Sequence, residues 1–123
     1  MKKILIILCL ILQISSVKSQ TQVDIHTNYG DIRLELYDAL VPNTVNNFVS
    51  LINQGFYDGV IFHRVIDNFM IQGGDGFPAP PSIMDEFDST LSNVQKTISM
   101  ANSGPNTGTC QFFINLVDNT YLD

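Results

Sequence analysis

The sequence predicts a mainly β domain, either a short-stranded barrel or a sandwich, with one capping helix. Three observations support this class. Apolar and polar residues alternate early in the domain, one later segment has apolar residues at helical spacing, and short apolar runs follow between turn-forming residues. Alternation and short runs are typical of antiparallel strands. These patterns do not choose between a barrel and a sandwich.

The first 19 residues are set apart from this domain because they have the pattern of a secretory signal peptide. Lys2 and Lys3 precede an apolar run over residues 4–14, and small or modest residues up to Ser19 suit a cleavage site. A membrane anchor is the alternative, but a bilayer-spanning helix needs about 20 apolar residues. We therefore expect a signal peptide at residues 1–19, one domain at residues 20–123, and a secretory location: an ER lumen, a periplasm or the cell exterior.

The N-terminal part of the domain is predicted to form a β-hairpin followed by a helix. Apolar residues alternate with polar ones over residues 23–27 and again over residues 32–36, around a turn at residues 29–30. Pro42 can open a helix, apolar residues then recur at helical spacing, and Gly55 supplies a stop. We expect this helix to cap an open end or a face of a sheet.

Four short strands are predicted after the helix. They cover residues 60–65, 70–73, 97–101 and 111–116. The connection over residues 76–93 contains three prolines followed by Asp85, Glu86 and Asp88, and proline cannot donate a hydrogen bond to a sheet. This connection is therefore predicted to be an exposed acidic loop without a central strand.

The predicted domain is strongly acidic. Without residues 1–19 it has twelve acidic residues against Arg33, Arg64 and Lys96, a formal net charge of −9. Because nucleic acids are bound through positive charge, a nucleic acid is not an expected partner. The same acidity favours solubility, and stable membrane insertion is not expected after the signal peptide is cleaved.

No metal or other cofactor is expected. His26 and His63 lack companion ligands at zinc-like spacing. Cys110 is the only cysteine after residue 19, so the domain has no disulfide of its own, and no adjacent histidine or basic residue is present to activate this thiol. We expect Cys110 to be a buried structural residue.

One segment, residues 62–75, combines a cation with large apolar side chains. Arg64 is the only basic residue between Arg33 and Lys96, and the segment ends in a glutamine, two glycines and an aspartate. An arginine beside apolar side chains and an amide suits a groove that grips an apolar group while it hydrogen-bonds a carbonyl or an amide. The segment therefore predicts a peptide-recognition site.

Two blocks of sequence carry a family resemblance. The first reads FHRVIDNFMIQGGD over residues 62–75, and the second reads SMANSGPNT over residues 99–107 and QFFIN over residues 111–115. Both resemble the central motifs of the cyclophilins, the cyclosporin-binding peptidyl-prolyl cis-trans isomerases. The resemblance implies a cyclophilin-like antiparallel β-barrel with capping helices. It also implies an enzyme that accelerates rotation about Xaa-Pro bonds and assists protein folding, with proline-containing peptides and folding proteins as partners.

The resemblance also implies roles for individual positions. Arg64 corresponds to the family's catalytic arginine. The walls of the proline pocket correspond to Phe69, Met70, Phe113 and Leu122. The groove that holds the peptide backbone corresponds to Gln72, Ala101, Asn102 and Gln111. Tyr121 borders the site where many cyclophilins have Trp, so cyclosporin is an expected ligand with weakened binding.

Strand alternation supports part of this assignment. It places Gln111 and Phe113 on one face of their strand, which leaves Cys110 on the interior side. It also places Met70 and Gln72 on one face, so that Phe69 points to the other side. A bulge or a strand start at Phe69 is needed to bring it into the site.

The last residue of the sequence limits the predicted fold. The family continues beyond the position of Asp123 with a groove histidine, further strands and a second helix. We expect the barrel of a chain truncated there to remain open, the first hairpin to have an unpaired edge, and the domain to be marginally stable and prone to aggregate. The alternative function is therefore a proline-peptide binding module that is catalytically weak or inactive.

Overall fold

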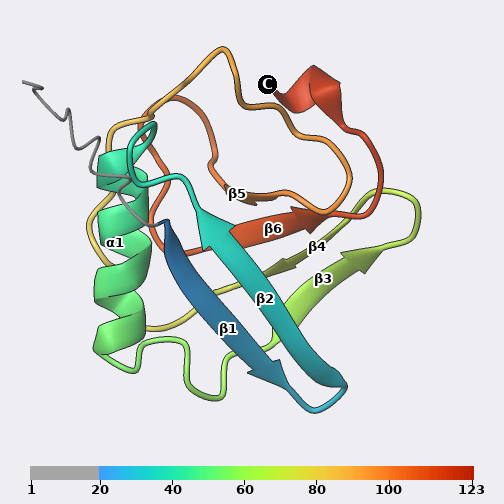
Figure 1. Ribbon diagram of the computed structural model, residues 1–123. Helices are drawn as coiled ribbons and strands as arrows, with labels where there is room; N and C mark the ends of the chain where they lie inside the picture. The colour runs from blue at the N-terminus through green and yellow to red at the C-terminus, as the bar shows by residue number, and fades with distance from the viewer. Residues whose placement is uncertain (1–19) are drawn as a thin grey trace, which may run out of the picture.

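The computed structural model describes residues 20–123, and the predicted signal peptide lies outside the described residues. Residues 20–123 form six strands, one α-helix and one short 3-10 helix (Figure 1). The elements are β1 (Thr21–Thr27), β2 (Gly30–Leu36), α1 (Pro42–Asn53), β3 (Phe62–Ile66), β4 (Met70–Gly73), β5 (Ile98–Met100), β6 (Phe112–Asn115) and η1 (Thr120–Leu122). All strand pairs are antiparallel, so the predicted mainly β class is confirmed.

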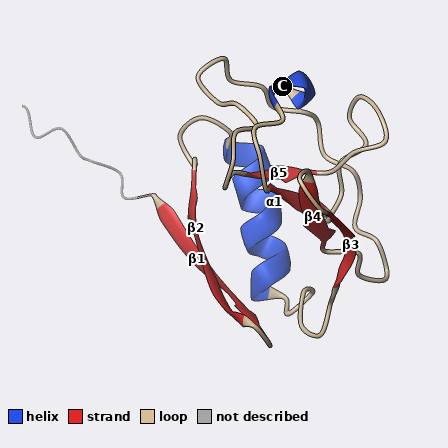
Figure 2. Cartoon of the chain, turned by 90° about the vertical axis from the view of Figure 1, so that its right-hand side faces the viewer, coloured by secondary structure: helices blue, strands red, loops and turns tan. Residues whose placement is uncertain are grey.

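The strands form two separate sheets. Within the described residues β1 pairs only with β2, and the second sheet has the order β3-β4-β6-β5. The hairpin crosses one side of the four-stranded sheet, and α1 lies at one end of the space between them (Figures 1 and 2). The predicted unpaired edge of the hairpin is thus confirmed, and residues 20–123 do not close a barrel.

The hairpin and the helix follow the predicted local signals. The register of β1 and β2 ends at the pair of Thr27 with Gly30, so the turn consists of Asn28 and Tyr29 and lies one residue earlier than predicted, because Gly30 already belongs to β2. Helix α1 begins at Pro42, and Gly55 follows its C-terminal end with a φ of +68°, a left-handed conformation that glycine adopts without a Cβ clash. No helix within residues 20–123 is long and apolar enough to cross a membrane.

The core lies between the two sheets and α1. Its buried cluster contains Leu34 and Leu36 of β2, Val45 and Phe48 of α1, and Phe112 of β6. The rings of Phe48 and Phe112 meet edge to face at a centroid distance of 5.6 Å. Truncation of such a buried ring to alanine costs about 3–5 kcal/mol, so these contacts hold the four-stranded sheet against the helix.

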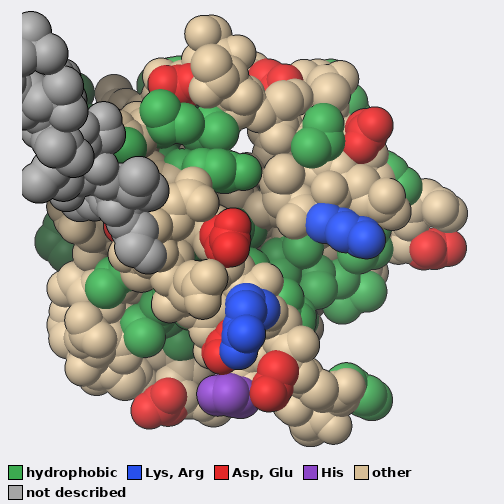
Figure 3. Space-filling model, in the orientation of Figure 1, with side chains coloured by type: hydrophobic (Ala, Val, Ile, Leu, Met, Phe, Trp, Pro, Cys, Tyr) green, Lys and Arg blue, Asp and Glu red, His purple; other side chains and the backbone are tan. Residues whose placement is uncertain are grey.

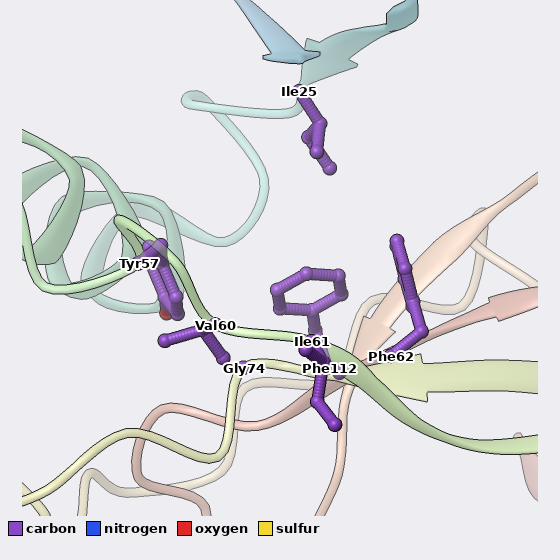
Figure 4. Close-up of a pocket in the computed structure, with 8 residues that line it drawn as sticks. Ile25, Tyr57, Val60, Ile61, Phe62, Gly74 and Phe112 are labelled. Atoms are coloured by element: carbon purple, nitrogen blue, oxygen red, sulfur yellow. The ribbon is translucent and has the colours of Figure 1, made fainter. Parts of the chain in front are cut away.

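One flank of this core is open as a small apolar pocket. Ile25 points from the hairpin toward Phe62 and Phe112 of the other sheet, and Tyr57 lies beside them (Figure 4). Burial raises the pKa of the Tyr57 hydroxyl, which donates a hydrogen bond of 2.9 Å to the carbonyl oxygen of Cys110. The Cys110 side chain is itself buried, as predicted.

Three of the four predicted later strands needed small corrections. The predicted strand over residues 60–65 begins at Phe62, because the amide of Val60 donates to the carbonyl of Tyr57 and thereby belongs to a turn. Strands β5 and β6 are shorter than predicted by one residue at each end, and β4 has the predicted bounds.

The proline-rich connection has no strand in the two sheets, as predicted, but its acidic residues are not simply exposed. Helix α1 has no side-chain cap of its own, and Glu86 accepts hydrogen bonds from the backbone amides of Asn43 and Thr44 at 3.1 and 2.6 Å. Burial alone would raise the pKa of Glu86, but these and further hydrogen bonds from the same residues outweigh it and lower the pKa. The prediction missed this cap because the two segments are far apart in sequence.

Candidate functional site

One face of the four-stranded sheet brings residues from all four strands into a row. Arg64 of β3 pairs with Gln72 of β4, Gln72 pairs with Phe113 of β6, and Phe113 pairs with Ser99 of β5. Directly paired residues point to the same side of a sheet, so the four side chains share a surface, which we call the Arg64 face. The core residue Phe112 points to the opposite side, in agreement with the predicted alternation.

A chain of hydrogen bonds runs across the Arg64 face. Arg64 Nη1 donates to Gln72 Oε1 at 3.3 Å, and Gln72 Nε2 donates to Gln111 Oε1 at 2.8 Å. Gln111 Nε2 then donates to Asp75 Oδ1 at 3.0 Å. Because a carboxylate only accepts, Asp75 orients both amides so that the oxygen of Gln72 faces the arginine.

Arg64 has no carboxylate partner within residues 20–123, and its side chain is exposed. Its only hydrogen bond to a side chain in this part of the chain is the one to Gln72. A guanidinium has five N–H donors and is always charged. Arg64 can therefore donate hydrogen bonds to a carbonyl oxygen of another molecule, or to an amide nitrogen whose bond is twisted out of resonance.

Two aromatic rings border this surface. Phe69 lies immediately before β4 and follows Asn68, whose φ is +54°. The Phe69 ring stacks on the ring of Tyr121 in η1, with a centroid distance of 6.4 Å and an interplanar angle of 14°. The strand starts at Met70 instead of Phe69, so Phe69 is a turn residue that the alternation of β4 does not constrain, and its ring can reach Tyr121.

The other predicted pocket residues differ in accessibility. Phe113 is half-buried on the Arg64 face. Leu122 of η1 is 40% exposed, whereas Met70 is only 2% exposed although its strand register puts it on the same face. Met70 can therefore form only the floor of a proline pocket, since almost none of its surface is open to a ligand.

The two remaining predicted groove residues lie beside Gln111 and in the turn that follows β5. The amide of Ala101 donates to the carbonyl of Gln111 at 2.9 Å, which extends the β5–β6 pairing by one step. Asn102 is exposed, and its side-chain oxygen accepts a hydrogen bond from the amide of Gly104 at 3.2 Å. The structure thus brings Ala101 next to the hydrogen-bonded chain and uses the Asn102 side chain to close its own turn.

Sequence reasoning assigned no role to several residues that support this surface: Asp75, Asn93, Ser99, Asn115 and Asn119. One signal was available, because an asparagine ends the apolar run of β6 where alternation would allow an apolar residue. The contacts of these side chains could not be predicted, since most connect segments far apart in sequence. Among residues 20–123 no three His, Cys, Asp or Glu side chains are grouped to hold a metal ion.

Comparison with known proteins places these features in a family. Residues 22–123 match the sequence profile described as cyclophilin type peptidyl-prolyl cis-trans isomerase/CLD. The chain is 46% identical over 113 residues to peptidyl-prolyl cis-trans isomerase A of Dickeya dadantii, covering 85% of this chain and 59% of that protein. It is 44% identical over 108 residues to peptidyl-prolyl cis-trans isomerase B of Escherichia coli, covering 82% of this chain and 66% of that protein.

A solved structure shows the same likeness. A cyclophilin type peptidyl-prolyl cis-trans isomerase of Cryptosporidium parvum, crystallised in the presence of the dipeptide Ala-Pro, matches with a TM-score of 0.78 and 34% identity. The match covers 84% of this chain and 72% of that chain. The chain spans 59% of the length of the Dickeya dadantii relative and 66% of the length of the Escherichia coli relative. Its profile match, its identity to these relatives and its fold show that it belongs to the cyclophilin-type peptidyl-prolyl cis-trans isomerase family.

Proposed function

We propose that this protein catalyses cis/trans rotation about Xaa-Pro peptide bonds and thereby assists protein folding. The observation that carries the proposal is the exposed Arg64 guanidinium, which has no carboxylate partner within residues 20–123 and lies in one row with Gln72 and Phe113. Family membership and the names of the two bacterial relatives support the same activity.

The reaction needs a positioned cation rather than a proton transfer. Resonance gives the C–N bond of a peptide partial double-bond character and a rotation barrier of about 18–20 kcal/mol. Uncatalysed exchange at Xaa-Pro takes roughly tens to hundreds of seconds. When Arg64 donates to the prolyl nitrogen, it withdraws the nitrogen lone pair from resonance and lowers the energy of the twisted state. No bond is broken, so no nucleophile or metal is required.

The remaining residues of the site hold the substrate. We assign the proline ring to Phe69, Phe113, Leu122 and the floor residue Met70, with Tyr121 at the border. Gln72, Gln111, Ala101 and Asn102 hold the peptide on either side of the bond that turns. With the chain held on both sides, rotation is confined to one bond, which is the positioning contribution to the rate. The Ala-Pro dipeptide named for the Cryptosporidium structure supports proline-containing peptides as ligands.

Two finer assignments belong to the same proposal. We propose that cyclosporin binds only weakly, because the site has Tyr121 as its border aromatic. We also propose that residues 1–19 are a signal peptide that directs the protein to the secretory pathway, supported by the lysine pair and the apolar run in the sequence. Detection of the protein with a free amino terminus at residue 20 outside the cytosol would support this location.

The proposed activity is tested with the purified protein and a proline-containing peptide whose isomerisation is followed directly. We expect wild type to accelerate the exchange and Arg64→Ala to lower kcat/KM by about a hundredfold or more, the usual effect of removing a transition-state donor. Arg33→Ala is the matched control, because it removes another exposed arginine, this one from the hairpin. Peptide binding without acceleration that depends on Arg64 would instead support the alternative of a catalytically weak or inactive binding module.

A further inference from the structure

A network of buried side-chain amides lies beneath the aromatic border of the site. Asn119 Nδ2 donates to the carbonyl oxygen of Phe69 at 3.0 Å and to Asn115 Oδ1 at 2.8 Å. Asn115 Nδ2 donates in turn to Asn93 Oδ1 at 3.2 Å and to Thr97 Oγ1 at 3.0 Å. The network therefore connects the turn before β4, the end of β6, the segment before β5 and the segment before η1.

The two central amides are almost completely enclosed. Asn115 is 1% exposed and Asn119 is 2% exposed. A buried amide without partners costs free energy, yet no buried side-chain nitrogen or oxygen of residues 20–123 lacks a hydrogen bond. A fully satisfied polar network favours one arrangement of the groups that it connects. This network therefore fixes the positions of the segments that it joins.

Asn119 holds both members of the stacked ring pair. Its side chain donates to the backbone of Phe69, and its own backbone amide donates to the carbonyl of Asn93 at 2.7 Å. It is also the residue from which η1 starts, so Tyr121 follows it by two positions. The two rings, which come from segments about 50 residues apart in sequence, therefore share one anchoring side chain.

We propose that Asn119 is a positioning residue that holds Phe69 and Tyr121 as one aromatic wall for the substrate's proline ring. The inference rests on the proposed function, because it specifies how the proline-binding side of that site is ordered. Asn119 is almost fully buried and makes no hydrogen bond to Arg64, so it acts through the two rings. Its loss should therefore weaken substrate binding and raise KM, with a smaller effect on kcat, since Arg64 remains in place.

The test is a double variant, Asn115→Leu with Asn119→Leu, in the full chain. It removes both central amides together, so neither amide is left buried without its hydrogen-bond partner. Their former partners keep other hydrogen bonds: Phe69 O accepts from the amide of Leu116, Asn93 Oδ1 accepts from Ser99 Oγ, and Thr97 Oγ1 donates to Val94 O. The readouts are the aromatic NMR signals of Phe69 and Tyr121 and the Kd of an Xaa-Pro peptide.

We expect the ring-current shifts of the stacked pair to be lost and the Kd to rise about tenfold, which corresponds to about 1.4 kcal/mol of binding free energy. Val45→Ala is the matched control, because it destabilises the core at α1 and contacts neither ring. It should leave the ring signals and the Kd unchanged. If the double variant does not fold, Asn119→Ser, which has one short donor in place of two, is measured in the same way.

Unchanged ring signals and Kd in a folded variant would overturn the proposal. Equal changes in Val45→Ala would also overturn it, because they would show a general effect of lower stability. These outcomes are separate from failure of the proposed function. A wild-type protein without isomerase activity would contradict catalysis, while its ring signals and peptide affinity would still report on the wall.

Discussion

The two arginines of the sheets have opposite environments. Arg33 on the hairpin makes a two-pronged pair with Asp24, with Nε to Oδ1 at 2.8 Å and Nη2 to Oδ2 at 3.0 Å. Arg64 on the other sheet has a single side-chain contact within residues 20–123, a 3.3 Å hydrogen bond to the neutral Gln72. Both side chains are exposed, so the difference lies in the cross-strand neighbour rather than in burial.

The charged side chains around Arg33 add to the difference between the two arginines. Basic, acidic and histidine side chains gather over the hairpin, where His26 also pairs with Asp31 (Figure 3). The hydrogen bond from Arg33 and its charge lower the pKa of Asp24, so the pair is fully ionised near neutral pH. An arginine paired in this way is compensated, whereas an arginine beside an amide keeps an uncompensated charge. We infer that the amide at position 72 is what leaves Arg64 available.

Among the changes that keep the charge of Arg64, the largest expected effect comes from giving it the kind of partner that Arg33 has. In Gln72→Glu a carboxylate replaces the amide, and we expect kcat/KM to fall by about ten- to a hundredfold, because the cation then stabilises its neighbour instead of the twisted substrate. The measurement is the proline-peptide isomerisation assay.

Two controls separate charge from loss of the amide. Gln72→Ala removes the same hydrogen bonds without adding charge and should cost less activity. Gln22→Glu makes the same substitution on the hairpin and should leave the activity unchanged. An equal fall in Gln72→Glu and Gln72→Ala would contradict the electrostatic explanation.

A smaller effect is expected from replacing each arginine by lysine. Arg64→Lys keeps the charge but loses the planar set of donors, and we expect kcat/KM to fall by about tenfold. Arg33→Lys should leave kcat/KM unchanged in the same assay. Full activity of Arg64→Lys would show that charge alone is sufficient and that donor geometry contributes nothing.

Removing the carboxylate partner of Arg33 is expected to affect stability slightly and activity not at all. Asp24→Asn breaks the ion pair, but an exposed pair contributes little because water and salt screen it. We expect a small decrease in Tm at low salt that disappears at about 1 M salt. Circular dichroism melting at both salt concentrations checks this, and a large decrease that persists in high salt would contradict it.

The smallest expected effect is a pH dependence of hairpin stability. The hydrogen bond to Asp31, and then its charge, raise the pKa of His26 above its ordinary value of 6.5. The stability from this pair is therefore fully present below pH 6.5 and is lost as the pH rises through the raised pKa. Denaturant unfolding across this range should show the loss in wild type but not in His26→Asn. If the free energy of unfolding changes with pH equally in the two proteins, the pH dependence comes from groups other than His26.

Local patterns were sufficient for much of the fold. Alternation predicted the hairpin, Pro42 and Gly55 predicted the ends of the helix, and β4 was predicted with the bounds that it has. Each of these signals lies within a few residues of the structure that it specifies. The start of β3 was predicted wrongly because residues 57–60 form a turn although Val60 and Ile61 are apolar.

The candidate site was predicted only in part, for a related reason. The two motif blocks named the residues, and alternation placed Phe113 and Phe112 on opposite faces of β6. The near-complete burial of Met70 did not follow from either. Met70 is buried because it lies at the end of the Arg64 face that other residues cover, where it pairs with the buried Asn115.

Reading along the chain was therefore enough for the β class, the helix, the two motif blocks and the acidic charge, because these depend on composition and on neighbours a few positions apart. It could not show that Arg64 lacks a carboxylate partner in the described part of the chain, that Glu86 caps α1 across 42 positions, or that Asn119 reaches Phe69 across 50. Each of these contacts, or its absence, depends on which segments folding brings together. The unpaired charge of Arg64 and the stacking of Phe69 on Tyr121 are thus decided only when the strands and segments assemble.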